Sequence, residues 1–512
     1  MRRKAAVLVA VVLLAILALP QAVRAADEDL QKKMDALTKE VQELQKQMAE
    51  SKEQGKKKSI SDWLTIGGDY RFRVDSLRGK VADFYNFPDI VAWQMGGMVG
   101  APPLTQGYTV KNDILYTNRF GLNLKAKATQ DVTFTGRLLM YKSFGNNDSV
   151  ATSGTYFADR IGVFDGTEGH VPGDGKLTVD EAYVTWTNIL DEPVWFSVGR
   201  RPSTGGIPSH LRQNNEKPGN GGIPALLVDY AFDGLVLGWA PDIEALPGAY
   251  AKICYGRGFE NGYTTPFSSN NNLKDTDMIG VSVVPYDTDR LYLDLQYNRG
   301  MNIFDFPVMS SSTLGPLRPT TDLGDIDWWG ITALSTLKNV GPGTLNVFGS
   351  AALSKTHPNG NTVVYNGFDT GAGLMYTGTE KSVTGNAFYV GARYDYTRTR
   401  TKLGLEYNRG SENWITFTPA ADDIWTSKLG TRGNVYEVYV IQELNLKPVS
   451  SYFAKTFFRF GYQYYDFVYT GSNNWVGAPV KVADLAASPM NAQLLTPMKN
   501  AQDFYGTFEV KF

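Results

Sequence analysis

The chain has 512 residues, of which 50 are Lys or Arg and 52 are Asp or Glu, and it contains a single cysteine, Cys254. One cysteine excludes a disulfide scaffold and any zinc or iron-sulfur site built from several thiolates. A formal charge of -2 lacks the basic footprint of a nucleic-acid-binding protein, so we predict no nucleic-acid partner.

The first 25 residues have the features of an export signal. Basic residues at 2–4 precede an apolar stretch at 5–19, and small residues follow up to Ala25. This order is typical of a secretory signal peptide, which we place at 1–25. An uncleaved membrane anchor is the alternative, although the apolar stretch is short for a helix that crosses a bilayer.

A short helical segment follows the signal. Leu30, Leu37 and Leu44 recur every seven residues, and a second apolar residue lies four positions after each of them. This heptad pattern predicts an α-helical coiled coil at 27–54, although a single amphipathic helix would show a similar pattern. The Lys-rich segment 55–63 then reads as a linker.

From residue 64 onward the heptad pattern ends, and apolar residues recur at every second position. Tyr70, Phe72 and Val74, for example, alternate with charged residues, and the same period recurs to the end of the chain. We therefore predict an all-β domain at 64–512, whose strands each have one apolar and one polar face. The sixteen predicted strands are 64–75, 114–127, 132–143, 177–187, 193–201, 225–239, 248–257, 276–285, 290–299, 326–337, 344–354, 386–397, 401–409, 434–446, 455–467 and 502–512.

The connections between these strands indicate a barrel. Short turns alternate with long loops rich in Gly, Asn, Pro and Ser, and the strand count is even, as in a transmembrane antiparallel β-barrel. Tyr255, Tyr297 and Tyr407 each stand near the end of a strand, where a membrane-interface girdle requires aromatic residues. A soluble β-sandwich is the alternative, since its strands also alternate.

Few residues could support catalysis. His170, His210 and His357 are far apart in the sequence, and none lies near a nucleophile motif. Segment 174–181 resembles the second half of a calcium-binding loop, but His170 and Pro172 would occupy the first ligand positions. No C-x-x-C-H sequence is present for covalent haem. We predict that the protein is not an enzyme and has no catalytic residue, metal site or cofactor.

The polar faces of the strands supply candidates for the lining of a pore. Basic candidates concentrate on the early strands and acidic ones on the later strands, so two arcs of opposite charge could face each other across water and tune ion selectivity. Local pairs between arginines and carboxylates are the alternative. The predicted pore-lining residues are Arg71, Arg73, Arg119, Lys125, Lys127, Arg137, Arg201, Asp294, Arg393, Asp395, Glu406, Glu437 and Arg459.

The whole pattern resembles bacterial outer-membrane porins, and in particular those that carry a short N-terminal coil. The resemblance rests on the signal peptide, the coil, the alternating strands from Leu64 and the terminal Phe512. It implies a barrel in outer-membrane lipid, a homotrimer and a periplasmic coil. General porins usually lack the coil, which we expect to support trimer assembly or to contact the cell wall.

A barrel of sixteen strands needs an inward loop to narrow it. The loop after the fifth strand, 202–224, is the best candidate, because it is rich in Gly and Pro and has the same place in the strand order as the constriction loop of general porins. A second candidate is the loop 76–113, which could instead pack between subunits. The constriction-loop candidates are His210, Arg212, Glu216 and Lys217.

The sequence therefore predicts a passive diffusion channel for small hydrophilic solutes or ions in the bacterial outer membrane. The alternative is a barrel scaffold that sheathes or docks a separate multihaem cytochrome for electron transfer across that membrane.

Overall fold

A computed structural model describes most of the chain. The described residues are 62–146, 150–152, 172–203, 206–219, 226–228, 230–263, 273–306, 318–365, 368–418, 422–447 and 454–512. The predicted signal peptide, the predicted coiled coil and nearly all of the linker lie outside these residues.

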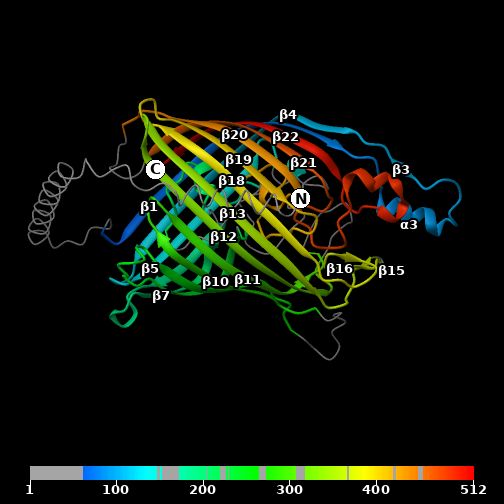
Figure 1. Ribbon diagram of the computed structural model, residues 1–512, viewed down its shortest axis with the longest axis horizontal. Coiled ribbons are helices and arrows are strands. Elements are labelled where there is room, and N and C mark those ends of the chain that lie inside the picture. Colours follow the sequence, from blue (N-terminus) through cyan, green and yellow to red (C-terminus); the bar gives the residue numbers. More distant parts are fainter. Residues whose placement is uncertain are drawn as a thin grey trace, which may run out of the picture.

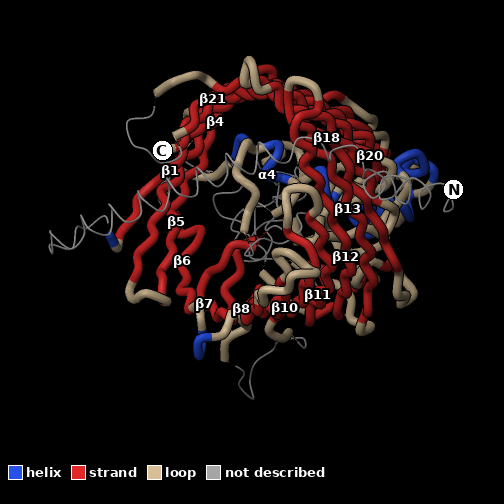
Figure 2. Tube along the Cα trace, turned by 60° about the vertical axis from the view of Figure 1, so that its left-hand side comes forward, coloured by secondary structure: helices blue, strands red, loops and turns tan. Residues whose placement is uncertain are grey.

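Sixteen strands form one closed antiparallel barrel, in agreement with the predicted fold class and strand count (Figures 1 and 2). Each strand pairs with the next one along the chain, and the first pairs with the last. Closure leaves no strand edge unpaired. The strands are β1 (Leu64–Val81), β4 (Thr109–Lys127), β5 (Val132–Ser143), β6 (Thr178–Trp186), β7 (Val194–Ser203), β8 (Tyr230–Trp239), β9 (Tyr250–Phe259), β10 (Thr276–Asp287), β11 (Tyr292–Phe304), β12 (Asp322–Val340), β13 (Gly343–Pro358), β18 (Thr384–Tyr396), β19 (Thr401–Gly410), β20 (Gly433–Glu443), β21 (Lys455–Phe467) and β22 (Met498–Lys511).

The remaining elements lie in the connections between barrel strands. They include the two-residue strands β2 (Phe84–Tyr85), β3 (Leu104–Thr105), β14 (Val364–Tyr365), β15 (Phe368–Asp369), β16 (Ala372–Gly373) and β17 (Tyr376–Thr377). The helices are α3 (Phe87–Met95) and α4 (Ser209–Arg212), with 3-10 turns η2 (Val150–Thr152), η4 (Ile189–Asp191), η5 (Lys428–Gly430), η6 (Val482–Ala487) and η7 (Pro489–Asn491).

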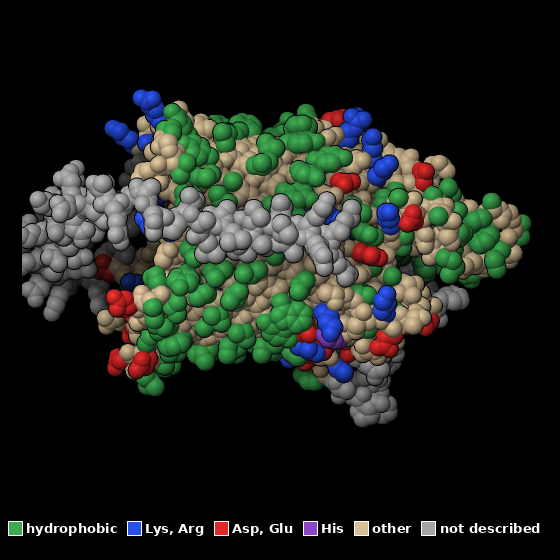
Figure 3. All heavy atoms as spheres, viewed as in Figure 1, with side chains coloured by type: hydrophobic (Ala, Val, Ile, Leu, Met, Phe, Trp, Pro, Cys, Tyr) green, Lys and Arg blue, Asp and Glu red, His purple; other side chains and the backbone are tan. Residues whose placement is uncertain are grey.

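A band of apolar side chains covers the outside of the barrel. On the face in Figure 3 this band runs across the strands, and charged side chains gather at the two ends. In water such a continuous apolar surface would drive aggregation, whereas in a bilayer it contacts lipid. The barrel therefore spans a membrane. The most exposed members include Ile66, Leu237, Ile253, Leu403, Leu405, Phe460 and Phe504.

The three predicted girdle tyrosines lie on this outer face. The ring of Tyr297 packs on Trp329, with 5.6 Å between their centroids, and the Tyr297 hydroxyl donates to Asp327 at 2.8 Å. Tyr407 packs on Tyr436 in the same way, at 4.9 Å. An apolar ring against lipid and a hydroxyl bonded to a polar neighbour is the arrangement that a membrane interface favours.

The two ends of the barrel differ. Short turns join the strands at one end, as between β12 and β13, and the long loops lie at the other end. We refer to these as the turn end and the loop end. Among the described residues, no helix is long and apolar enough to cross a membrane.

The predicted loop 76–113 is shorter than expected and does not enter the barrel. β1 continues to Val81 and β4 begins at Thr109, because the inner face of this extension is apolar and packs, through Leu77 and Leu115, against Trp425 and Leu485. The helix α3 projects beyond the loop end instead of covering the lumen (Figure 1). Of the two roles considered for this loop, narrowing of the lumen does not fit this position, and packing between subunits stays a prediction.

Candidate functional site

The loop after β7 lies inside the barrel. Its helix α4 is buried and stands within the ring of strands (Figure 2). Lumen-facing cations from the opposite wall hold its backbone: Arg393 of β18 donates to the carbonyl of Leu211 at 2.6 Å, and Arg459 of β21 donates to that of Arg212 at 3.0 Å. Lys511 of β22 donates to the carbonyl of Gln213 at 3.0 Å. Residues 206–219 thus cross the lumen.

The four predicted side chains of this loop have different environments. Arg212 pairs with Asp423 at 2.5 Å and with Glu437 at 3.0 Å, and all three groups are buried. Glu216 pairs with Lys455 and Lys217 pairs with Asp287. Because Lys455 begins β21 and Asp287 ends β10, these last pairs lie near the turn end.

His210 is buried in this loop, and its Nδ1 has no hydrogen-bond partner among the described residues. Burial, together with the positive charges of Arg393 and Lys217, lowers the pKa of His210 to about 3. The imidazole is therefore neutral and adds no charge to the lumen at physiological pH.

A second loop, the described residues 411–418 and 422–432 after β19, also folds inward. Trp414, Ile415 and Phe417 are buried in the lumen, and Trp328 of β12 packs on Phe417 with 4.7 Å between ring centroids. The Trp328 indole donates to the Ile415 carbonyl at 2.8 Å. This loop was not predicted to enter the barrel, although the large apolar residues Trp414, Ile415 and Phe417 within a polar loop were a signal of burial.

The two inward loops contact each other. The Thr416 hydroxyl donates to the carbonyl oxygens of Leu226 and Leu227, each at 2.7 Å. Val228 forms a bridge with Phe417. The loops therefore make one body that fills part of the lumen.

The second loop is fixed to the wall by a group of buried charges that we call the Asp422 cluster: Asp422 with Arg71, Arg73 and Arg459. Arg71 pairs with the Asp422 carboxylate, and Arg459 Nη2 lies 3.1 Å from it. Arg73 donates to the Asp422 carbonyl at 2.9 Å. Burial alone would raise the pKa of Asp422, but Arg71, Arg459 and Arg73 hold it well below its ordinary value. The carboxylate is therefore charged.

A second group of charges continues this attachment. Lys428 of the loop pairs with Glu406 of β19 and with Glu437 of β20, the latter at 2.5 Å. Tyr505 of β22 donates to Glu437 at 2.7 Å. The wall from β18 through β22 to β1 is thus covered by loop residues that neutralise its charges.

The other predicted lining residues also lie on the inner face of their strands. Arg137 pairs with Asp69 at 2.6 Å, and Arg119 lies 3.5 Å from the same carboxylate. Lys125 and Lys127 are exposed at the turn end of β4. Further along, Arg201 stacks over the Tyr183 ring at 5.4 Å, Arg393 pairs with Asp395 at 2.7 Å, and Asp294 accepts from Ser282 and Tyr292, each at 3.0 Å.

Most lumen charges are therefore paired locally. Of the two arrangements considered from the sequence, local Arg-carboxylate pairing describes Arg71, Arg73, Arg137, Arg393 and Arg459. Within the described ranges, no group of three or more His, Cys, Asp or Glu could hold a metal ion.

Comparisons with known proteins give one family and several distant structures. The family model described as "Protein of unknown function (DUF3373)" matches residues 109–512. No curated protein matches the sequence. The solved structures include OprB of Pseudomonas putida, at 10% identity over 88% of this chain and 95% of that chain with a TM-score of 0.41. An anion-selective porin from Comamonas acidovorans is 11% identical over 88% of this chain and 99% of that chain, with a TM-score of 0.40. OmpT, an outer membrane protein of Vibrio cholerae in its trimer form, is 12% identical over 88% of this chain and 100% of that chain, with a TM-score of 0.38.

Proposed function

This chain belongs to the DUF3373 family, and we propose that it is a bacterial outer-membrane channel through which small hydrophilic solutes or ions diffuse. The observation that carries the proposal is the combination of an apolar outer band with a polar, charged lumen that two inward loops narrow. A barrel with lipid outside and water inside has this distribution of side chains. The channel is proposed to act without catalysis.

The distribution of the inward loops favours a path along one wall. The loops cover the wall from β18 to β1, whereas Lys125 and Lys127 of β4 are exposed. A path along β4 to β7 would leave solutes in contact with these lysines, because Leu227, Val228 and Lys217 of the inward loop lie against the wall from β8 onward. Homotrimeric assembly is part of the proposal, as the resemblance to general porins implies.

Liposome swelling tests the function. Vesicles that contain the purified protein are expected to swell in small sugars and to swell more slowly as sugar size increases, because the inward loops restrict the lumen. Vesicles with heat-denatured protein are the control. Equal swelling with and without folded protein would contradict a diffusion channel.

The exposed lysines give a prediction on selectivity. Replacing Lys125 and Lys127 by glutamine is expected to shift the reversal potential in a salt gradient toward cations, because two cations leave the lumen. Lys338→Gln is the matched control, since Lys338 pairs with Asp289 on an exposed turn at 2.6 Å. An unchanged reversal potential in the double variant would mean that ions do not pass β4.

A barrel that sheathes a multihaem cytochrome would need the part of the lumen that residues 206–219, 411–418 and 422–432 occupy. This alternative predicts haem absorbance in protein purified from its native membrane under mild detergent. Stoichiometric haem in that preparation would favour it over a diffusion channel. Hydrolysis of a generic ester by the purified protein would likewise contradict the absence of catalysis.

A further inference from the structure

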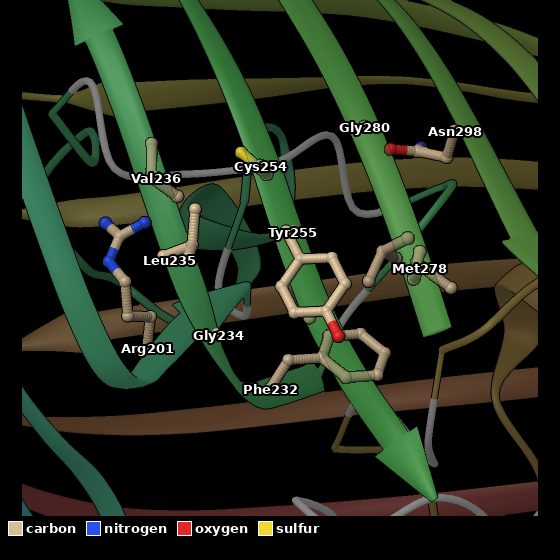
Figure 4. Close-up of a pocket in the computed structure, with 12 residues that line it drawn as sticks. Arg201, Phe232, Gly234, Leu235, Val236, Cys254, Tyr255, Met278, Gly280 and Asn298 are labelled. Atoms are coloured by element: carbon tan, nitrogen blue, oxygen red, sulfur yellow. The ribbon is translucent and has the colours of Figure 1, made fainter. Parts of the chain in front are cut away.

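A hollow opens on the inner wall between β7 and β11 (Figure 4). The hollow is open on one side: about 410 Å³ lies within its rim when open solvent is included, and the enclosed part is about 30 Å³. Phe232, Val236 and Met278 give it apolar walls, while Arg201 and Asn298 contribute polar groups. Val228, from the loop after β7, also lines it, so the hollow lies between the wall and the inward loops.

Three glycines line this hollow where the wall is closely packed. Gly234, Gly256 and Gly280 lie on the adjacent strands β8, β9 and β10 and all line it. A Cβ at Gly256 would lie 2.9 Å from Phe232 Cβ, and a Cβ at Gly280 would overlap the Asn298 carboxamide. The glycines therefore let Phe232 and Asn298 approach the backbone of the wall closely, which fixes the position of both side chains beside the hollow.

Arg201 differs from the other predicted lumen arginines. Arg71, Arg73, Arg137, Arg393 and Arg459 each lie within hydrogen-bond distance of a carboxylate. In the part of the chain that the structure describes, Arg201 forms no ion pair, and its buried Nε has no partner. A largely covered guanidinium without a counter-ion is costly, and an anion in the hollow would remove that cost.

Asn298 is the second polar group without a full set of partners. Its Oδ1 accepts from Gln296 at 2.9 Å, but its buried Nδ2 donates to no group in the described ranges. Figure 4 shows Asn298 and Arg201 on opposite sides of Cys254, with Met278 on the side of Asn298. The hollow thus presents one cation at one end, a free N–H donor at the other and apolar side chains between them.

We infer that this hollow binds small organic carboxylates that carry an apolar body, and holds them on their way through the channel. The carboxylate pairs with Arg201, the apolar body packs on Phe232, Val236 and Met278, and an acceptor at the far end accepts from Asn298. A single unpaired guanidinium matches a monoanion better than a doubly charged phosphate. The inference deepens the proposed function and rests on it, because solutes meet the hollow in passage only if they diffuse through the lumen.

Isothermal titration calorimetry on the full-length protein in detergent micelles tests the binding. The probe is 4-hydroxybenzoate, which has a carboxylate, an apolar ring and an acceptor at its far end. We expect it to bind more tightly than 4-hydroxybenzyl alcohol, which lacks the carboxylate, and more tightly than acetate, which lacks the ring. Arg201→Gln is expected to weaken the binding of 4-hydroxybenzoate roughly tenfold or more, because it removes a charge-assisted hydrogen bond.

Arg200→Gln is the matched control, because Arg200 is the adjacent arginine of the same strand and points to the outer face, opposite Asp233. It is expected to bind the probe like the natural protein. If Arg201→Gln fails to fold, Val236→Phe fills the hollow without a change of charge and is expected to abolish binding. Equal affinity for the carboxylate and the alcohol, or equal affinity of both arginine variants, would overturn the inference.

Conductance separates this inference from the proposed function. If the protein conducts but 4-hydroxybenzoate neither binds nor blocks it, the channel function stands and the binding site is contradicted. If the protein binds the probe but never conducts, the binding site stands and the channel function is contradicted. Binding together with a reversible reduction of the KCl current is the expected result.

Discussion

Asp422→Asn is expected to release the second inward loop from the barrel wall. Arg71 is 2% exposed and its ion pair is with Asp422, so the variant leaves a buried guanidinium without a counter-ion. Removal of one partner from a buried ion pair costs about 3 to 5 kcal/mol. The expected results are faster protease cleavage within 411–432 and a larger, noisier single-channel current.

Two further variants control this prediction. Glu216→Gln removes an ion pair whose carboxylate is 70% exposed, and it is expected to change the loop's stability by less than about 1 kcal/mol. The double variant Arg71→Gln with Asp422→Asn removes both charges and is expected to cost less than the two single variants together. If Asp422→Asn showed the same protease cleavage and the same single-channel current as the unmodified protein, the Asp422 cluster would not hold the second inward loop to the wall.

Leu405→Arg is expected to destabilise the barrel in lipid. Leu405 is 63% exposed in the middle of β19 and lies opposite Val438, which is 51% exposed on β20. An arginine on the lipid face near the bilayer midplane costs about 2 to 4 kcal/mol. The free energy of unfolding, measured by denaturant titration in lipid vesicles, is expected to fall by that amount.

The position of the arginine decides this result. Thr401→Arg is the matched control, because Thr401 lies on the same outer face at the turn end of β19. Near the interface the cost of an arginine falls to about 0 to 1 kcal/mol. If both variants lowered the stability equally, the outer band would not be facing the hydrocarbon core.

The barrel strands could be predicted because each one repeats a local rule. In the segment 401–409, apolar and polar residues alternate with a period of two, and the structure has the strand β19 at Thr401–Gly410. The loop-end parts of β1 and β4 were missed, because the outward residues there are no longer apolar. Beyond the membrane the outward residues, such as Arg78 and Lys80, are polar and exposed, and the inward ones, such as Leu77, are buried.

The interior could be predicted only in part. The loop after β7 could be selected by its place in the strand order, and the inward face of Arg71 or Glu437 follows from alternation. The inward fold of the loop after β19 could not be predicted in the same way, since Asp422 finds Arg71 at a separation of 351 residues. Such pairing depends on the closed barrel, which brings β1 beside β22, and not on any local pattern.

Single-channel conductance of the purified, folded protein in a planar bilayer tests the central claim most directly. We expect stable current steps that occur in multiples of three, for a trimer of barrels that each conduct beside their inward loops. Folded, membrane-inserted protein that carries no current would contradict it, because the two inward loops would then close the barrel instead of narrowing it.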